Sequence, residues 1–286
     1  MRLVSFDAGT GGRVGLLVDD GIVDLSARIG VRSLRGMIEA GRIEEARPYL
    51  AAPPDHAVAD IRFLPVIPDP EKIFCAGTNY ADHLAEAAAV GIKRTPTEHP
   101  PLFIRTPPTL VGHREPILRP RVSDHLDYEC ELAVIIGRPG RHIAKADALS
   151  HVAGYSCFND ASVRDWQFHT HQVTPGKNFA ATGGFGPALV TPDEVGDPQA
   201  LDIATRVNGE VLQHANTKDM IFDIVTLISY ISTFQPLGPG DVIATGTCAG
   251  VALARKPPNW MKPGDICEIV IEKVGTLVNP IGQEAS

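Results

Sequence analysis

Two glutamates in one apolar stretch are the residues of this sequence best suited to chemistry. Glu129 and Glu131 lie in the run from Leu126 to Gly137, whose apolar residues predict a largely buried β-strand. Side chains two positions apart on a strand share a face, so these carboxylates would project together, about 6–7 Å apart. Their repulsion and lost hydration require a positive charge between them, and a hard divalent cation is the simplest source. A strand with one wet face is the alternative interpretation.

A third carboxylate follows a second predicted strand. Residues 151–167 predict a strand that ends in a polar turn, and Asp160 lies in that turn. Three carboxylates from two strands are typical of a Mg²⁺ or Mn²⁺ site that leaves positions open for water and substrate. Zinc is the weaker interpretation, because no cysteine or histidine pair has zinc-ligand spacing.

A histidine and a glutamate form a candidate proton-transfer pair. His83 and Glu86 are three residues apart in a short predicted helix, so they would be neighbours on one helix face. A carboxylate orients an adjacent imidazole and stabilises its protonated form, which suits a general base that activates water. A solvated surface pair is the alternative and is the commoner outcome for such a pair taken alone. The tight turn before the helix, which carries Asn79 and Tyr80, favours the catalytic interpretation.

Two cationic side chains are candidates for binding an anion. Lys177 lies in a glycine-containing turn, from which it would point inward and bind a carboxylate or a developing enolate. Arg105 follows an apolar island, Leu102 to Ile104, within residues 87–120. Such a long, weakly structured segment is typical of a lid or binding loop. An anionic substrate is within reach of Arg105 there, although a surface arginine is the commoner outcome.

Composition excludes some classes of partner. The chain has 286 residues, of which 44% are hydrophobic and 21% charged, as in an ordinary globular protein with a substantial core. The formal net charge of −8 argues against nucleic acid or an anionic membrane as partner, since both require a basic surface. A small anionic substrate remains compatible, because a bound dication and a few cationic side chains reverse the local field.

The cysteines and the apolar segments indicate the cellular compartment of the protein. No segment is long and apolar enough to cross a membrane, and the N-terminal residues resemble a strand rather than a secretory signal. We therefore expect a cytoplasmic protein. Its cysteines are odd in number and scattered, which predicts reduced thiols rather than disulfides: Cys75, Cys130, Cys157, Cys248 and Cys267.

Two domains are predicted. A proline-rich linker, Pro65 to Pro70, separates them. Residues 1–67 would form a small α/β domain with three short strands and a helix opening at Ser33. This domain has no cluster of chemically useful side chains, so its predicted role is structural. Residues 68–286 would form the catalytic domain.

The second half of the chain predicts a β-rich scaffold with one helix. Asn208-Gly209 is a strong signal for a hairpin turn between two strands. Asp219 to Phe234 is the best amphipathic helix pattern, with Ile221 among the residues on its buried side. The small residues from Thr245 to Val251 would let the backbone approach a ligand closely.

Taken in order, these motifs resemble the fumarylacetoacetate hydrolase superfamily, in its acylpyruvate hydrolase and 2-oxo-hepta-3-ene-dioate hydratase-like branch. The resemblance covers the chain from about residue 70 to the C-terminus. The residues that carry it are Gly77-Thr78-Asn79-Tyr80 with His83 and Glu86, Asp127-Tyr128-Glu129-Cys130-Glu131-Leu132, Asn159 to Gln167, Gly176-Lys177, Val207-Asn208-Gly209-Glu210, Gly240 to Thr247, and Gly275-Thr276-Leu277-Val278-Asn279.

The resemblance implies a fold and a set of roles. The fold would be α+β and β-rich, with a mixed β-roll catalytic domain and a small N-terminal domain, assembled as a homodimer. Mg²⁺ or Mn²⁺ would be held by Glu129, Glu131 and Asp160. The remaining roles would be a water-activating pair on a lid helix, an active-site lysine, and two positions near the substrate: His83 with Glu86, Lys177, and Gln167 with Thr247.

The implied activity is hydrolysis of a carbon–carbon bond in a 2,4-dioxo acid, an acylpyruvate such as maleylpyruvate or fumarylpyruvate, in aromatic or related catabolism. Arg105 stands where the family usually has lysine and would hold a second substrate carboxylate in a bidentate manner. Alternatives that use the same site are oxaloacetate decarboxylase or tautomerase, 2-oxo-enoic acid hydratase and ureidoglycolate lyase. A non-catalytic metal-binding protein is a more remote alternative.

Overall fold

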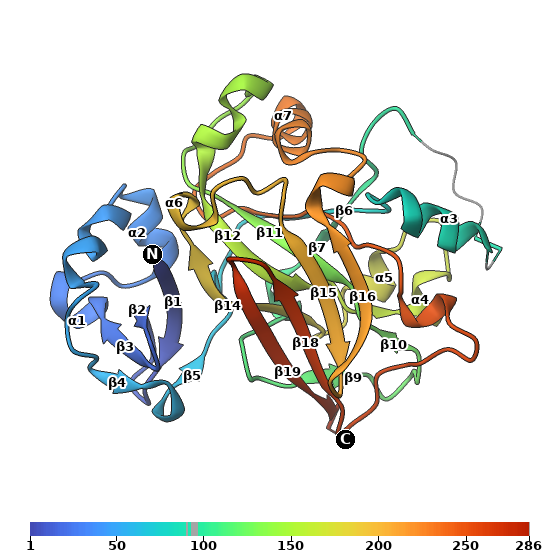
Figure 1. The fold of residues 1–286 in the computed structure, drawn as a ribbon, viewed down its shortest axis with the longest axis horizontal. Helices are drawn as coiled ribbons and strands as arrows, with labels where there is room; N and C mark the ends of the chain where they lie inside the picture. Colours follow the sequence, from blue (N-terminus) through green and yellow to red (C-terminus); the bar gives the residue numbers. More distant parts are fainter. Residues whose placement is uncertain (90, 93–96, 286) are drawn as a thin grey trace.

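The computed structural model describes residues 1–89, 91–92 and 97–285 (Figure 1). The predicted lid or binding loop, residues 87–120, includes residues 90 and 93–96, which lie outside the described part. Two β-sheets dominate the described residues, and the helices are short and peripheral. The predicted α+β, β-rich class is confirmed.

The larger sheet has 12 strands in the described chain and runs through both predicted domains. Its main path is β4 (His56–Ala57), β3 (Gly21–Asp24), β2 (Gly12–Val18), β1 (Arg2–Asp7), β14 (Gly183–Val190), β12 (Val152–Asn159), β11 (Cys130–Ile136), β17 (Val242–Ala244), β6 (Ile73–Ala76) and β7 (Leu102–Arg105). Off this path, β5 (Arg62–Phe63) pairs with β1, and β8 (Leu110–Val111) pairs with β14.

The N-terminal strands extend the catalytic sheet. β1 pairs antiparallel with β14, with Leu3 opposite Leu189. The predicted strands of residues 1–24 and the helix capped by Ser33 are present, the latter as α2 (Leu34–Glu39) after α1 (Leu25–Ile29). The domain boundary after residue 67 stays a prediction, and hydrogen bonding between strands continues across it.

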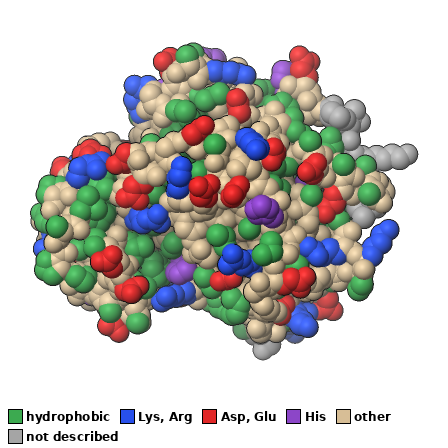
Figure 2. Space-filling model, viewed as in Figure 1, with side chains coloured by type: hydrophobic (Ala, Val, Ile, Leu, Met, Phe, Trp, Pro, Cys, Tyr) green, Lys and Arg blue, Asp and Glu red, His purple; other side chains and the backbone are tan. Residues whose placement is uncertain are grey.

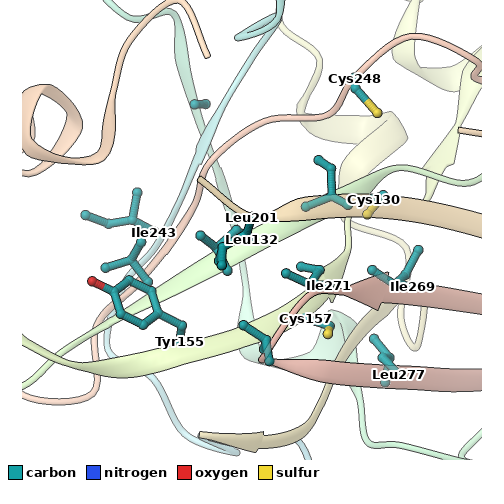
Figure 3. Close-up of a cluster of buried hydrophobic side chains, with 14 of the residues drawn as sticks. Cys130, Leu132, Tyr155, Cys157, Leu201, Ile243, Cys248, Ile269, Ile271 and Leu277 are labelled. Carbon is teal, nitrogen blue, oxygen red and sulfur yellow. The ribbon is translucent and has the colours of Figure 1, made fainter. Parts of the chain in front are cut away.

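A second sheet packs against the first. In the described chain it contains β16 (Glu210–Asn216), β15 (Asp202–Val207), β18 (Ile266–Ile271), β19 (Gly275–Gln283) and β9 (Ile117–Arg119). Asn208 and Gly209 both have positive φ, +51° and +84°, as a type I′ turn requires, so the predicted hairpin is confirmed. Figure 3 shows the contact between the sheets, where side chains of β11 and β12 meet those of β18 and β19: Leu132, Tyr155, Cys157, Ile269, Ile271 and Leu277.

The long strand predicted from Leu126 to Gly137 is interrupted. The structure has β10 (Leu126–Asp127), paired with β13 (Ser162–Val163), and then β11 from Cys130. Glu129 lies outside the ladder, and its backbone N–H donates at 3.1 Å to the side-chain Oδ1 of Asn159 in β12 in place of a backbone carbonyl. β11 itself is buried at every position, which explains its continuous apolar run.

The amphipathic helix predicted from Asp219 begins later. α7 is Ile224–Phe234, and its first turn is capped by Asp223, which accepts from Thr226 N at 2.8 Å. The preceding residues are held outside the helix by Asn79, whose amide Oδ1 accepts from Phe222 N at 2.8 Å. Ile221 is therefore 44% exposed, not buried as predicted.

The remaining helices are α3 (Ala81–Ala89), α4 (Arg164–Gln167), α5 (Thr174–Lys177) and α6 (Pro192–Val195). All five cysteines are free and buried. No helix in the described part of the chain is long and apolar enough to cross a membrane. On the face drawn in Figure 2, acidic and basic side chains are interspersed with apolar ones, and they form no continuous basic surface there.

A buried histidine joins the N-terminal strands to the second sheet. His113 Nδ1 accepts from Val278 N at 3.1 Å, and its ring packs edge-on against Phe63. Burial, together with the charge of Arg114, lowers the pKa of His113 from 6.5 to about 4. The native state therefore keeps this ring neutral, whereas the unfolded chain protonates it below pH 6.5.

This difference predicts a stability that falls as the pH falls from about 6.5 toward 4. Relative to pH 7, His113 should cost about 1–2 kcal/mol of unfolding free energy at pH 5. In His113→Asn, Oδ1 can replace Nδ1 as acceptor, and we expect this variant to lose the part of the pH dependence of unfolding that comes from His113. The measurement is urea unfolding of both proteins in chelator at pH 7 and pH 5. An equal pH dependence in both proteins would show that His113 does not titrate in this way.

Candidate active site

Three buried carboxylates converge at the ends of two central strands. Glu129 precedes β11, Glu131 lies within it, and Asp160 directly follows β12. β11 and β12 pair antiparallel with Cys130 opposite Asn159, so the start of one strand meets the end of the other. Oxygens of the three carboxylates lie within 4.8 Å of one another. The structure brings together the three predicted metal ligands.

Three cationic side chains surround this carboxylate cluster. Lys177 Nζ lies 2.6 Å from Glu129 Oε2 and 2.7 Å from Asp160 Oδ2. Arg105 Nε lies 2.5 Å from Asp160 Oδ1, and neither atom has a hydrogen-bond partner, so their contact is an ion pair without hydrogen-bond alignment. Arg164 Nη2 lies 2.8 Å from Glu129 Oε1. The lysine and both arginines are nearly inaccessible to solvent.

The charges act on the carboxylates unequally. Burial alone would raise the pKa of Glu129, but Lys177 and Arg164 hold that pKa well below its usual range. Burial raises the pKa of Glu131, and the neighbouring charges of Asp160 and Glu129 raise it further. Among the described contacts, Glu131 accepts a hydrogen bond from Gly246 N at 2.8 Å and forms no ion pair. The cluster thus has one carboxylate without a cationic partner.

This donor set fits a hard divalent cation. Its ligands would all be carboxylate oxygens, and Mg²⁺ and Mn²⁺ prefer such hard oxygen ligands to softer sulfur ligands. An additional cation beside Glu131 would supply the positive charge that this carboxylate lacks. Asp160 Oδ1 accepts no hydrogen bond although it is buried, and its described partner is the ion-paired Arg105. The buried Glu131, which has no ion pair among the described contacts, is therefore the carboxylate that fits an added cation best.

A small cavity joins two of the three carboxylates to other predicted site residues. It has a volume of about 40 Å³, and its lining includes Glu129, Glu131, His83, Gln167, Lys177 and Thr247. Next to it lies an open groove of about 770 Å³, which shares Gly77, Phe103, Gln167 and Val173 with the cavity. The groove provides a route from solvent to the carboxylates.

The predicted proton-transfer pair is formed. His83 and Glu86 lie on α3, with Nδ1 3.0 Å from Glu86 Oε2. The other carboxylate oxygen, Oε1, accepts from Gly250 N at 2.8 Å. Because Glu86 occupies Nδ1, the Nε2 atom of His83 is the ring nitrogen left to exchange a proton with a ligand in the cavity.

Gln167 and Thr247, the two predicted substrate contacts, line the cavity, and each accepts a hydrogen bond from a neighbouring side chain. Gln167 Oε1 accepts from Arg164 Nη1 at 2.8 Å, and Thr247 Oγ1 accepts from Gln213 Nε2 at 2.9 Å. The predicted substrate role of Arg105 has no such geometric support. Its guanidinium is completely buried, faces Asp160 and the carbonyl of Ala161, and is not among the residues that line the cavity.

Sequence reasoning assigned no role to Arg164 or Asp127. Arg164 Nε lies 2.7 Å from Asp127 Oδ2, so the arginine bridges Asp127 and Glu129 while it lines the cavity. The available signal was spacing: Asp127 stands two residues before Glu129, and Arg164 four residues after Asp160. Asp127 ends β10 and Arg164 directly follows β13, the strand paired with β10, so opposite charges at these two positions are placed to form a buried ion pair.

The fold and site define a two-sheet α+β protein with a buried carboxylate site for a divalent cation and a histidine–glutamate pair on the same cavity. A family profile described as fumarylacetoacetate (FAA) hydrolase, C-terminal, matches residues 72–282. The chain belongs to the fumarylacetoacetate hydrolase family, as its motifs predicted.

Individual relatives differ in activity. The chain is 39% identical to a mitochondrial oxaloacetate tautomerase of Homo sapiens, over 98% of this chain and 91% of the relative. It is 41% identical to an oxaloacetate tautomerase of Bacillus subtilis, over 79% of this chain and 75% of the relative. Among solved structures, maleylpyruvate hydrolase of Sphingobium sp. SYK-6, in complex with manganese(II) and pyruvate, is 31% identical, with a TM-score of 0.81 and full coverage of both chains. This match confirms the predicted fold.

Glu131 gives a direct test of the cation site. We expect Glu131→Gln to weaken Mn²⁺ binding by about 100-fold or more, since even outer partners of metal ligands contribute about 10–100-fold. The measurement is a Mn²⁺ titration followed by electron paramagnetic resonance or calorimetry. Glu268→Gln, on the distant strand β18, is the matched control and should bind as the parent protein does. Equal affinities in the parent protein and Glu131→Gln would rule out this site.

Proposed function

We propose that the chain interconverts the enol and keto forms of oxaloacetate with a bound Mg²⁺ or Mn²⁺. The observation that carries this proposal is the single cavity lined by Glu129, Glu131, His83 and Lys177. A cation site, a proton-transfer group and a buried positive charge are the three components that enolisation of a 2-oxo acid requires. Similarity to oxaloacetate tautomerases over nearly the whole chain supports the choice of substrate.

Enolisation moves one proton and neither adds nor removes other atoms. In the keto-to-enol direction, His83 takes a proton from C3, and the electrons of that C–H bond form the C2–C3 double bond. The electrons of the C2–O π bond move to the oxygen, which becomes negative and then takes up the proton carried by His83, so that His83 is neutral again. The reverse direction retraces these steps. Glu86 holds the imidazole in position, and the ammonium of Lys177 stabilises the negative oxygen.

The carboxylates Glu129, Glu131 and Asp160 would hold the cation. When bound, it would supply Lewis-acid polarisation of a chelated 2-oxo acid, which acidifies the neighbouring C–H bond. The manganese(II) in the related maleylpyruvate hydrolase structure supports this assignment.

Hydrolysis of acylpyruvates, the activity first expected from the motifs, is the second candidate. It needs room for an acyl group and for an attacking water in addition to the 2-oxo acid. The cavity of about 40 Å³ is far smaller than that, whereas the adjoining groove of about 770 Å³ has the room. The likeness to maleylpyruvate hydrolase also favours this candidate. Oxaloacetate also exceeds the cavity, but as the smaller substrate it would occupy less of the groove than an acylpyruvate.

The other related reactions would use the same groups and differ only in the bond that changes. Decarboxylation of oxaloacetate is an outcome of the assay below, whereas hydration of a 2-oxo-enoic acid and cleavage of ureidoglycolate require those substrates in the panel as well. A homodimer in the cytoplasm that binds a small anionic oxo acid, and neither nucleic acid nor membrane, stays our expectation for assembly and location.

The deciding experiment presents enol oxaloacetate and a panel of acylpyruvates to the Mn²⁺-loaded and chelator-treated protein. Loss of the enol absorbance of oxaloacetate, with no carbon dioxide and no pyruvate released, is the expected result. Release of pyruvate from maleylpyruvate or fumarylpyruvate at a higher kcat/KM would favour the hydrolase. Pyruvate and carbon dioxide from oxaloacetate would identify a decarboxylase.

His83 is the residue whose loss should separate chemistry from cation binding. We expect His83→Ala to lower kcat/KM for tautomerisation by about 100- to 10,000-fold, the range typical of a general acid or base. Mn²⁺ affinity should change by less than about twofold, because His83 is not one of the three carboxylate ligands. His169→Ala, on the exposed loop after α4, is the matched control. Undiminished turnover in His83→Ala would remove this residue from the mechanism.

A further inference from the structure

Among the contacts that the structure describes, one hydrogen bond from a backbone group joins the side chains of helix α3 to the segment around Gly250. Glu86 Oε1 accepts from Gly250 N at 2.8 Å, and the same carboxylate holds His83 through Oε2. The position of the Gly250 peptide therefore fixes the carboxylate, and the carboxylate fixes the imidazole. Any group that holds Gly250 in place therefore affects the orientation of His83 indirectly, through Glu86.

Two side chains hold the other end of that residue. Tyr128 Oη donates to Gly250 O at 3.1 Å, and Arg255 Nε donates to the same oxygen at 3.3 Å. Arg255 Nη2 also donates to Leu212 O at 2.7 Å, which anchors the guanidinium to β16. Gly250 has φ +107°, and a Cβ there would meet Leu212 O at 2.1 Å, so only glycine fits this position.

The segment that follows is fixed by the residue before Tyr128. Asp127 accepts from Ala252 N at 2.7 Å and from Leu253 N at 3.1 Å. Asp127 and Tyr128 directly precede Glu129 in the chain. One short stretch, residues 127–129, thus contributes a carboxylate to the cation site and holds the segment on which α3 rests.

The apolar contact between α3 and this segment is loosely packed. A residual cavity of about 20 Å³ remains between them, lined by Ala87 and Ile92 on one side and by Val251, Leu253 and Ala254 on the other. α3 has five alanines in nine residues and buries only Ala87 among its described side chains. Burial of apolar side chains contributes little to the packing of α3 on this segment. The described hydrogen bond from Gly250 N to Glu86 therefore contributes much of the free energy that holds α3 in place.

We propose that Tyr128 and Arg255 are positioning residues for the reaction. They fix the Gly250 peptide as the docking point of α3, and through Glu86 they set the orientation of His83. Both lie outside the substrate cavity and touch none of the reacting atoms. The catalytic part of this proposal rests on the proposed function, in which His83 transfers the proton, whereas the docking of α3 does not depend on the substrate.

The test is Tyr128→Phe in the Mn²⁺-loaded protein, a change that removes one hydroxyl from a buried ring. The hydroxyl donates to Gly250 O and also accepts from Arg255 Nε at 3.2 Å, which still contacts Gly250 O in the variant. We expect kcat to fall about 3- to 10-fold, with KM within about twofold. Hydrogen exchange of the amides of residues 85–89 should speed up by a similar factor. Mn²⁺ affinity should stay within about twofold. Tyr155→Phe, at a buried tyrosine of β12, is the matched control and should change none of these.

A double-mutant cycle with Glu86→Ala tests the route of the effect. If Tyr128 acts through Glu86, Tyr128→Phe should not speed exchange in α3 further once Glu86 is gone. Unchanged kcat and exchange in the single variant would overturn the proposal, and so would weakened Mn²⁺ binding, which would assign Tyr128 to the cation site. If the parent protein has no tautomerase activity, the exchange results still decide the docking, so failure of the proposed function is distinguishable.

Discussion

Burial of three carboxylates side by side is the constraint on which the rest of this structure depends. Glu129, Glu131 and Asp160 lie inside a two-sheet protein, where each ionised group has lost its hydration and repels the other two. Such an arrangement is stable only if cations lie within contact distance. The buried lysine and arginines around the cluster are cations of this kind.

The backbone serves the same requirement. Antiparallel pairing of β11 with β12 places the beginning of one strand beside the end of the other, so ligands far apart in sequence meet. The break between β10 and β11 releases Glu129 from the ladder, and Asn159 takes over its N–H. Gly246, with φ +94°, places its N–H on Glu131, and a Cβ there would lie 2.6 Å from Asn79 Cβ. Strand pairing, a strand break and a glycine turn together position the three ligands.

Short-range patterns in the sequence predicted a large part of this arrangement. The Asn208-Gly209 turn and the three-residue spacing of His83 and Glu86 depend on local geometry, and the structure has both. The differences come from long-range contacts that override local preference. Glu129 lies outside β11, with its N–H on the Asn159 side chain, and Asn79 holds the residues before α7 out of the helix from 143 positions away. Neither partner is visible from the sequence around Glu129 or α7. The substrate role of Arg105 stays a prediction, and its guanidinium faces Asp160.

Charge balance in the interior bears on the order of binding. Within the described contacts, the carboxylates of Asp127, Glu129, Glu131 and Asp160 face the cations of Arg105, Arg164 and Lys177, which leaves one negative charge in excess when all are ionised. In that state the site repels an anionic oxo acid. A dication reverses the sign of the excess, and the same cavity then attracts the substrate. The raised pKa of Glu131 fits this view, since that carboxylate has most to gain from the added charge. Under the proposed function, this charge balance favours binding of the cation before the anionic oxo acid.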